Sequence, residues 1–363
     1  MRKFSVKPLI LVLVLAVLVI SMVAILFMNG GENREPKVES KGSITVFNWY
    51  DYIDEAVLTQ FTKETGYDVK YVCFTTNEEM YAKLSAGGGS YDVIFPSDYI
   101  IERMIKEGGL VKLDRSLIPN FENVIEWLKT PGYDPSSEYS VPYMWGTVGI
   151  LYNTDLVSEE ITSWTSMFDP QYKGGVFMMD SYRDSLMASL CMLGYDMNTK
   201  NAGELAAAKE ALIQQKQNGI VKGYLVDETK DKMINGEAAM ALMWSGDALY
   251  SISENEGDNL RYVVPSEGSN VWVDGMCIPA GSTNVEGAHA FINFLCGVDV
   301  ARANMDYIYY STPIQGVVDS MSEEELSNLT LNPTQDIIDR CNFFHDTSEY
   351  SEMYEEIWVE IRN

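Results

Sequence analysis

The sequence predicts an α/β protein with two lobes, in which each lobe is a mostly parallel sheet covered by helices. Short β-rich runs alternate with helical runs, and this alternation occurs twice along the chain. An aromatic run that contains glycines, 139–152, separates the two sets and is expected to cross from one lobe to the other. The chain has 363 residues and a hydrophobic content of 46%, which suffices for two lobes with their own cores.

A membrane segment is expected to precede the folded part. Three basic residues within the first seven positions come before an apolar run, 9–27, and this order is typical of a membrane-insertion signal. The run is long for a cleaved signal and no A-x-A pattern ends it, so we expect residues 1–29 to be an uncleaved anchor, with cleavage left open. Residues 30–42 are polar and are expected to form a tether.

The first lobe is predicted to begin with residues 43–147. Its expected strands are 43–47, 68–72 and 91–95, and its expected helices are 54–64, 77–85 and one that ends near 106. Asn77 is expected to cap the second helix, and Gly87 to Gly89 are expected to end it, because they lack the Lys-Ser/Thr of a phosphate loop. Ligands of parallel sheets bind at the carboxyl ends of strands, and Trp49 to Tyr52 and Ser97 to Tyr99 lie just beyond two of these ends.

The second lobe is predicted to span 148–272. Its expected strands are 175–179, 238–243 and 260–264, and its expected helices are 184–193, 204–217, 231–235 and 247–253. Residues 273–313 are expected to return to the first lobe through a strand, 272–278, and helices 285–295 and 298–305. Residues 314–363 end in an amphipathic helix, 353–361, and are assigned mainly to the second lobe.

Charge and cysteine content narrow the possible partners. The net charge of −27 at pH 7 argues against nucleic acid, whose phosphates require Lys and Arg. An acidic soluble surface explains most of this charge as well as a cationic ligand does, so the charge alone identifies no ligand. The cysteines form no CxxC pair and indicate neither a disulfide framework nor a zinc site, and their odd number leaves at least one free thiol or intermolecular bond. They are Cys73, Cys191, Cys277, Cys296 and Cys341.

Three stretches place a carboxylate two or three residues after a tryptophan: Trp49 to Asp51, Trp244 to Asp247 and Trp272 to Asp274. An indole face covers an alkyl chain and attracts an ammonium group, while a carboxylate accepts charge-assisted hydrogen bonds from that group. The pattern therefore predicts a receptor for an organic cation. We expect the three stretches to meet in one cleft that binds a linear polyamine.

The same residues also fit purely structural roles. Each tryptophan would fit in a hydrophobic core, and Ser97 and Tyr99 would fit as turn and packing residues. Asp247 opens a predicted helix and would fit as its cap. Asp184 would fit as a partner of Arg183, or as an acid favoured by the dipole at a helix start.

The sequence supports other functions less well than that of a receptor for an organic cation. The chain has only two histidines and lacks the G-x-S-x-G and H-E-x-x-H patterns, so we do not expect an enzyme. The pair Asp180 and Asp184 is the remaining candidate for glycoside hydrolysis. A receptor for another organic cation or for an oligosaccharide, and a ligand sensor that signals to a membrane receptor, also remain possible.

A set of segments occurs in a characteristic order: TVFNWYDY (45–52), QFTKETG (60–66), YDVIFPS (91–97), VPYMWG (141–146), GGVFMMD (174–180), MWSG (243–246), WVD (272–274) and YSTP (310–313). From Ser43 to its end the chain thereby resembles the spermidine/putrescine-binding proteins of polyamine ABC importers. The resemblance implies a type II periplasmic-binding-protein fold, in which two lobes joined by a hinge close on the ligand.

The resemblance also implies a receptor without catalysis, cofactor or metal. Such a receptor captures putrescine or spermidine and delivers it to ABC permease subunits and their ATPase. Its place would be the periplasm or the outer face of the plasma membrane, here with the N-terminal segment as a possible membrane tether. We further expect a monomer.

The resemblance assigns a ligand-binding role to individual residues. Tryptophans and tyrosines would enclose the methylene chain, Asp51 and Ser97 would make polar contacts, Asp274 would bind an ammonium or central amine, and Asp184 would bind a terminal amine. The expected ligand-binding residues are Trp49, Asp51, Tyr52, Ser97, Tyr99, Asp184, Trp244, Asp247, Trp272, Asp274 and Tyr310.

Three positions depart from the relatives that prefer spermidine. Ser181 stands where they carry another aspartate, and Phe344 falls near a position where they carry a glutamine. Asp247 stands where they have a small neutral residue, whereas relatives that prefer putrescine have an aspartate there. These differences favour putrescine, or a relaxed choice between the two polyamines.

Overall fold

The computed structural model describes residues 38–87 and 89–363, and one compact unit, Ser40–Asn363, holds the elements described here. The predicted membrane segment, 1–29, and most of the predicted tether, 30–42, lie outside the described residues. Within the described part, none of the helices combines the length and the apolar character needed to span a membrane.

The first lobe is built on three parallel strands: β1 (Gly42–Trp49) lies between β2 (Tyr67–Phe74) and β3 (Val93–Ile94). Its first helices are α2 (Glu55–Thr65), α3 (Asn77–Ser85) and α4 (Asp98–Lys106). The Asp54 side chain caps α2 by accepting from the Ala56 N–H, and Gly66 ends this helix in the left-handed conformation. Each of these six elements coincides with or overlaps a strand or helix that was predicted from the sequence.

The predicted cap of α3 is wrong. Thr76, not Asn77, precedes this helix, and its hydroxyl accepts from the N–H of Glu79. Asn77 is therefore the first helical residue and is buried. Its amide group is free to bind other side chains, described below.

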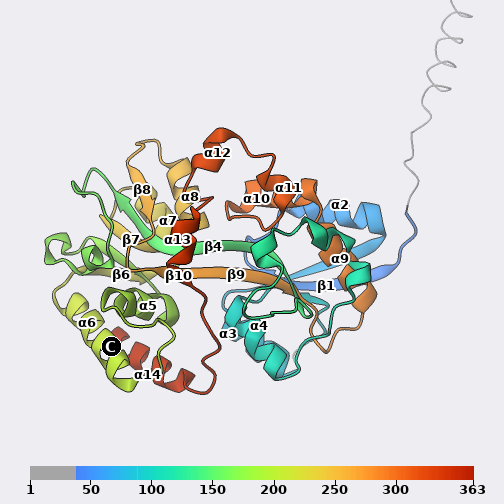
Figure 1. Ribbon diagram of the computed structural model, residues 1–363, viewed down its shortest axis with the longest axis horizontal. Coiled ribbons are helices and arrows are strands. Elements are labelled where there is room, and N and C mark those ends of the chain that lie inside the picture. Colours follow the sequence, from blue (N-terminus) through green and yellow to red (C-terminus); the bar gives the residue numbers. More distant parts are fainter. Residues whose placement is uncertain (1–37, 88) are drawn as a thin grey trace, which may run out of the picture. The chain divides into compact units, whose positions relative to one another are not determined.

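Two long antiparallel strands, β4 (Ser140–Asn153) and β9 (Ser269–Cys277), belong to both lobes (Figure 1). Between Ser140 and Thr147, β4 pairs with β9, and from Val148 it pairs with β7 (Met240–Trp244) and then also β8 (Leu260–Val263). Every residue of both long strands is buried. The predicted crossover is thus a single strand that changes partners halfway along its length.

The second lobe continues this path as β7, β5 (Val176–Met179) and β6 (Val221–Leu225), which are parallel to one another. Its helices are α5 (Tyr182–Met192), α6 (Ala202–Gln217), α7 (Glu228–Ile234) and α8 (Ser245–Glu254). Because the pairs of β4 and the β3–β9 pair are antiparallel, the sheet is mixed rather than mostly parallel as predicted. The sequence analysis also missed β6, whose half-exposed residues give no clear apolar pattern.

The chain then returns to the first lobe. Helices α9 (Val285–Leu295) and α10 (Val298–Ile308) pack on α2, and α11 (Gln315–Val318) packs on α10. Helix α12 (Glu323–Ser327) is attached to α10 by an ion pair in which Arg302 Nη2 lies 2.6 Å from Glu325 Oε1. In the described part of the chain, five short 3₁₀ helices connect the larger elements: η1 (Arg115–Leu117), η2 (Pro119–Asn123), η3 (Glu126–Leu128), η4 (Trp164–Phe168) and η5 (Pro170–Tyr172).

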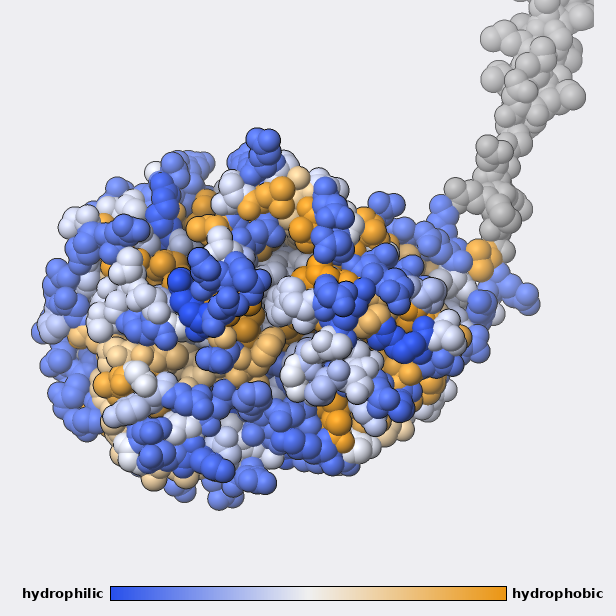
Figure 2. Space-filling model, viewed as in Figure 1, coloured by the Kyte–Doolittle hydropathy of each residue, from blue (hydrophilic) through white to orange (hydrophobic). Residues whose placement is uncertain are grey.

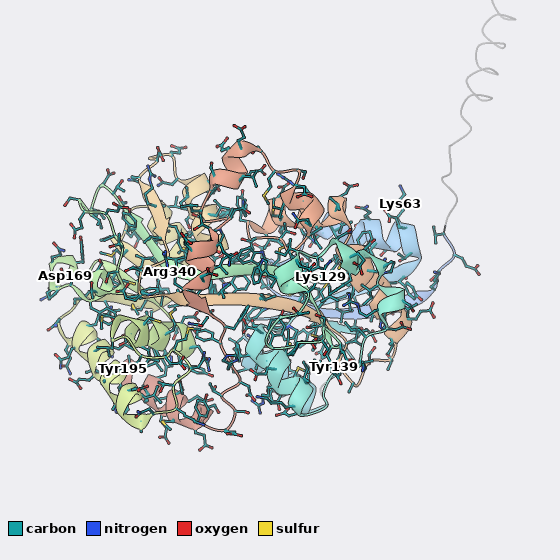
Figure 3. All side chains as sticks on the ribbon, in the orientation of Figure 1. Lys63, Lys129, Tyr139, Asp169, Tyr195 and Arg340 are labelled. Atoms are coloured by element: carbon teal, nitrogen blue, oxygen red, sulfur yellow. The ribbon has the colours of Figure 1, made fainter. Side chains whose placement is uncertain are left out.

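The C-terminal segment crosses to the second lobe. It forms α13 (Gln335–Asp339), β10 (Cys341–Asn342), which pairs with the start of β9, and α14 (Ser351–Arg362), which packs on α5 and α6. Arg340, labelled in Figure 3, donates from Nη2 to the carbonyl oxygen of Val264 at 2.8 Å. The end of the chain therefore stays attached to the strands that the lobes share.

The state of the cysteines and the polarity of the surface agree with what the composition indicated. All five cysteines are free, and four of them are buried. Hydrophilic residues cover most of the face shown in Figure 2. The buried acids need a separate explanation, because charged groups are seldom buried without a partner: they are Asp92, Asp98, Asp134, Asp184 and Asp274.

The start of β4 depends on the buried Asp134 carboxylate. It accepts hydrogen bonds from the N–H groups of Glu138, Tyr139 and Ser140 and from the Ser140 hydroxyl, at 2.9–3.1 Å. We expect Asp134→Ala to lower the free energy of unfolding by about 3 kcal/mol, because buried donors lose their acceptor. Urea denaturation measures this loss. The exposed Asp319→Ala serves as the control, and equal stability of the two variants would contradict the prediction.

Candidate ligand-binding site

The centre of the candidate site is the carboxylate of Asp274, which lies on the shared strand β9 and is 5% exposed. The Ser97 hydroxyl donates to its Oδ1 at 2.6 Å, and the Tyr52 hydroxyl donates to its Oδ2 at 2.8 Å. Ser97 and Asp274 also form an antiparallel backbone bridge, which fixes their separation. Three of the predicted residues, which come from distant parts of the sequence, therefore meet at one carboxylate.

The charge of Asp274 is poorly compensated. Burial raises the pKa of its carboxyl to about 7, although the hydrogen bonds from Ser97 and Tyr52 oppose this rise. Among residues 38–87 and 89–363, no Lys, Arg or His forms an ion pair with it. A buried carboxylate with two neutral donors and no cation is an incomplete arrangement that a ligand ammonium group would complete.

Aromatic rings surround this carboxylate. The Tyr310 ring meets Trp272 edge to face, with 5.0 Å between centroids, and meets Tyr52 in the same manner at 5.8 Å. We refer to Tyr52, Ser97, Trp272, Asp274 and Tyr310 as the Asp274 cluster. In the described part of the chain, the buried indole nitrogen of Trp272 has no hydrogen-bond partner, so this cluster retains one unused donor beside its unpaired charge.

Glycines allow the rings to approach the backbone. A Cβ atom on Gly146 of β4 would lie 2.7 Å from Cζ2 of Trp272, and a Cβ atom on Gly246 of α8 would lie 2.3 Å from Cδ1 of Tyr310. Gly246 belongs to the second lobe, whereas Tyr310 follows α10 of the first lobe. The Asp274 cluster thus contacts the stretch from Trp244 to Asp247 directly.

Asp247 is not a helix cap, so that interpretation of its role is wrong. Helix α8 begins at Ser245, the preceding Trp244 makes no side-chain cap, and Asp247 lies in the first turn. Its Oδ1 is 3.6 Å from the Nζ atom of Lys230 on α7. Burial raises the pKa of the Asp247 carboxyl, while Lys230 and a hydrogen bond with Tyr310 lower it. Unlike Asp274, this acid already has a cation.

Asp184 occupies the first turn of α5, where the helix dipole favours an acid. The hydroxyl of Ser181, the cap residue, donates to Oδ2 of Asp184 at 2.5 Å. Burial raises the pKa of the Asp184 carboxyl to about 6, and hydrogen bonding by Ser181, the positive charge of Arg183 and hydrogen bonding by Trp244 oppose this rise. No ion pair with Arg183 forms in the described residues, because that guanidinium binds Thr347 and Asn198.

The two upstream residues of the prediction lie apart from these contacts. The Trp49 indole donates to the carbonyl oxygen of Phe95 at 2.8 Å, and its ring packs on Phe74, which leaves it partly exposed. Asp51 is exposed, with a φ of 53°, and accepts from the Tyr307 hydroxyl at 2.7 Å. Within the described part of the chain, no hydrogen bond or ring contact joins either residue to the other predicted residues.

Asn77 was missed as a member of the site. Its amide nitrogen donates to the Ser97 hydroxyl at 3.0 Å and to the Tyr99 hydroxyl at 3.1 Å, and its amide oxygen accepts from the Ser97 N–H. Tyr99 in turn donates to Glu78 at 3.0 Å. Asn77 therefore orients the serine that holds Asp274. Its sequence context resembles an ordinary helix start, so no local pattern distinguishes this role.

The packing of Phe344 and Arg183 beside Tyr99 is a second feature that was not predicted. The Phe344 ring meets the Tyr99 ring edge to face, and the guanidinium of Arg183 lies over Phe344 at 4.3 Å from its centroid. Arg183 is buried, and its Nε has no partner among the described residues. The position near which spermidine-preferring relatives were expected to carry a glutamine is therefore filled here by an aromatic ring that is paired with a cation.

His289 and Asp180 are engaged in structural contacts. Both ring nitrogens of His289 contact the backbone: Nε2 accepts from the Asp114 N–H, and Nδ1 lies 2.7 Å from the carbonyl oxygen of Val285. Asp180 pairs with Arg362, whose Nη1 lies 2.5 Å from its Oδ1. In residues 38–87 and 89–363, no group of three or more His, Cys, Asp or Glu is placed to hold a metal ion.

The buried acids, the aromatic rings beside them and the two connected lobes together indicate the class of protein, which comparison with known proteins identifies. Residues 56–334 match the family model of bacterial extracellular solute-binding proteins, and the chain belongs to this family. Comparison with individual relatives identifies a narrower group within this family. The chain is 35% identical to the spermidine/putrescine-binding periplasmic protein of Salmonella typhimurium over 318 residues, which cover 87% of this chain and 90% of that protein.

Two other comparisons agree. The putrescine-binding periplasmic protein SpuD of Pseudomonas aeruginosa is 34% identical over 322 residues, which cover 83% of this chain and 86% of that protein. The structure of the spermidine/putrescine ABC transporter substrate-binding protein PotD from Streptococcus pneumoniae superposes with a TM-score of 0.78 at 35% identity, and covers 88% of this chain and 98% of PotD. These comparisons confirm the resemblance noted in the sequence and the two-lobed fold.

Gly246 provides a test of the contact between the lobes. We expect Gly246→Ala to push Tyr310 away from α8 and to separate the lobes, because the added methyl group would lie 2.3 Å from the Tyr310 ring. Small-angle X-ray scattering of the ligand-free full chain should then give a larger radius of gyration than wild type. Gly132→Ala is the matched control, since no atom lies within 4 Å of its Cβ position. Equal scattering from both variants would refute the contact.

Proposed function

We propose that the protein is the receptor of a polyamine ABC importer, which binds putrescine, spermidine or both between its two lobes and presents the closed form to the membrane permease. The observation that carries this proposal is the Asp274 carboxylate: it is buried, held by two neutral hydroxyls, and without a cationic partner in the described part of the chain. A ligand ammonium group would supply the missing positive charge.

The surroundings of Asp274 suit an amine that carries an alkyl chain. The rings of Trp272 and Tyr310 offer apolar surface for methylene groups and π-electron density for an ammonium group. Asp184, whose carboxyl is buried and likewise lacks an ion pair among the described residues, is the proposed partner of the second ammonium group. The roles assigned to Trp49, Asp51, Tyr99 and the other predicted residues belong to the same proposal, except that of Asp247, which already pairs with Lys230.

The relatives support the polyamine as ligand. Their names specify spermidine and putrescine for the Salmonella protein and putrescine for SpuD. Sequence identity above 30% over most of each chain supports transfer of the ligand class to this protein.

The receptor is proposed to close by a hinge in the shared strands. The lobes are taken as 43–147 with 273–313 and as 148–272 with most of 314–363. Strand β4 exchanges β9 for β7 between Thr147 and Val148, so bending at this point would move one lobe relative to the other. In this proposal the receptor catalyses no reaction. It acts in the periplasm or at the outer face of the plasma membrane, as a monomer, with the N-terminal segment as a possible tether.

Calorimetric titration of the full chain with putrescine, spermidine and maltose tests this proposal. We expect micromolar or tighter binding of at least one polyamine and none of maltose. Asp274→Asn should weaken polyamine binding more than tenfold, a loss of about 1.4 kcal/mol or more, because the ammonium group loses its charged partner. Asp180→Asn is the control, since that exposed acid pairs with Arg362. Maltose binding without polyamine binding would favour a sugar receptor instead.

Polyamine binding should also depend on pH. The pKa of Asp274 is about 7 in the free protein, and an ammonium group stabilises the ionised form, so binding expels the proton that Asp274 holds at lower pH. The dissociation constant should therefore rise by up to about tenfold per pH unit below 7 and level off above it. Calorimetry at pH 6.5 in buffers of different ionisation enthalpy should detect proton release. Binding without proton release at this pH would mean that Asp274 does not contact the ammonium group.

A further inference from the structure

Lys230 stands out among the residues near the candidate site, because it places the protein's own cation beside one of the predicted ligand-binding acids. It lies on α7, which packs on α8. Its Nζ atom is 3.6 Å from Oδ1 of Asp247 and 3.9 Å from Oδ1 of Asp227, and it lies over the Tyr250 ring at 5.8 Å from the centroid. The sequence analysis gave this lysine no role.

The Lys230 side chain is constrained and remains charged. About three quarters of it is shielded, with 26% exposed, and the Asp247 side chain is 16% exposed. Burial opposes the charge of Lys230, but the carboxylates of Asp247, Asp227 and Asp51 outweigh this effect and raise its pKa. Lys230 and Asp247 thus form a partly desolvated ion pair, with Asp227 as a second, more exposed carboxylate beside the lysine.

This ion pair adjoins the Asp274 cluster. Asp247 hydrogen-bonds with Tyr310, and Tyr310 packs against the neighbouring Gly246. Asp51, which acts on Lys230 electrostatically, belongs to the first lobe, whereas Lys230 and Asp247 belong to the second. Lys230 therefore pairs with an acid next to the contact between Gly246 of the second lobe and Tyr310 of the first.

Asp184, Asp247 and Asp274 consequently differ in whether their carboxylates are available to a ligand. In the described residues, Asp274 and Asp184 accept hydrogen bonds from neutral hydroxyls and lack ion pairs, although the charge of Arg183 also acts on Asp184, whereas Asp247 pairs with Lys230. Two unpaired carboxylates match the two ammonium groups of a diamine. A third ammonium group directed to Asp247 would compete with Lys230 for that carboxylate and would be repelled by the lysine.

We propose that Lys230 is a specificity-determining residue, which occupies the Asp247 carboxylate and thereby selects diamines over longer polyamines that carry a third positive charge. This inference rests on the proposed polyamine receptor function. It also changes the role given to Asp247: the acid does not bind putrescine directly but holds the cation that excludes a longer ligand.

The test compares putrescine and spermidine affinities of the full chain by calorimetry. Lys230→Gln exposes the Asp247 carboxylate to a ligand, so we expect the affinity for spermidine relative to putrescine to rise about tenfold, which one added charged contact would supply. Lys230→Arg keeps the charge and should keep the wild-type ratio. The double variant Lys230→Gln, Asp247→Asn should lose the gain, because the freed carboxylate is then absent.

Lys232→Gln provides the matched control. Lys232 lies on the same helix and pairs with Glu237 at 3.2 Å, so its substitution removes one positive charge without touching Asp247. It should leave the affinity ratio unchanged. Thermal unfolding monitors folding of each variant, and Lys230→Met, which retains the apolar stem, gives a second measurement if the glutamine variant does not fold.

The outcomes separate the two proposals. If wild type binds a polyamine but neither Lys230→Gln nor Lys230→Met changes the ratio, the Lys230 inference is overturned and the receptor function stands. An equal change in Lys232→Gln would also overturn it, since net charge alone would then explain the effect. If wild type binds neither polyamine, the receptor function fails and the Lys230 inference fails with it.

Discussion

The carboxylate of Asp274 is the constraint on which the rest of the site depends. It lies on β9, which both lobes share, and the two hydroxyls that hold it come from the ends of β-rich segments in the first lobe. Ser97 is in turn held by Asn77, and the Asp98 carboxylate beside it accepts from the Val273 N–H at 3.3 Å. Strand β9, the start of α3 and the start of α4 are therefore fixed relative to one another around a single negative charge.

This arrangement has a cost in the free protein. The pKa of Asp274 is raised from about 3.9 in an unfolded chain to about 7, so the native state binds more protons than the unfolded state between these values, and stability falls as pH rises through this window. Three pKa units correspond to an upper limit of about 4 kcal/mol above pH 7. A protein that needed Asp274 only for folding would do better with a neutral residue. An acid kept at this cost is explained by a cationic ligand that restores the balance.

Much of the fold was predictable because its signals are local. Apolar periodicity located most strands and helices, but β6 lies at the sheet edge with half-exposed residues and gave no such signal. The antiparallel pairing of β4 and β9 was not predictable, since it joins residues more than 100 positions apart. The assignment of Asn77 as a cap failed because Thr76 and Asn77 are both good caps, and only the position of Ser97 decides which one is used.

The pattern of a tryptophan followed by an acid led to the candidate site in two of its three occurrences. It identified Trp272 and Asp274, whose side chains share one cluster, and Trp244 and Asp247, which adjoin it. The same spacing at Trp49 and Asp51 leads elsewhere, because the indole of Trp49 is bound to the Phe95 carbonyl and the left-handed backbone at Asp51 turns that acid to Tyr307. Spacing shows that a carboxylate is near an indole in sequence, but not which groups approach it from other elements. Lys230 illustrates this limit, since it neutralises Asp247 from a different helix.

The partner change in β4 connects ligand binding to lobe movement. Gly146 admits the Trp272 ring just before this point, and the Thr147 N–H donates to the hydroxyl of Ser245, the first residue of α8, at 3.2 Å. Helix α8 also carries Gly246 and Asp247. A ligand that pressed on Trp272 and Tyr310 would thus act on the backbone where β4 leaves one lobe for the other. Because the binding residues and the proposed hinge share these contacts, the charge gained at Asp274 would favour the closed arrangement without any separate element to transmit the signal.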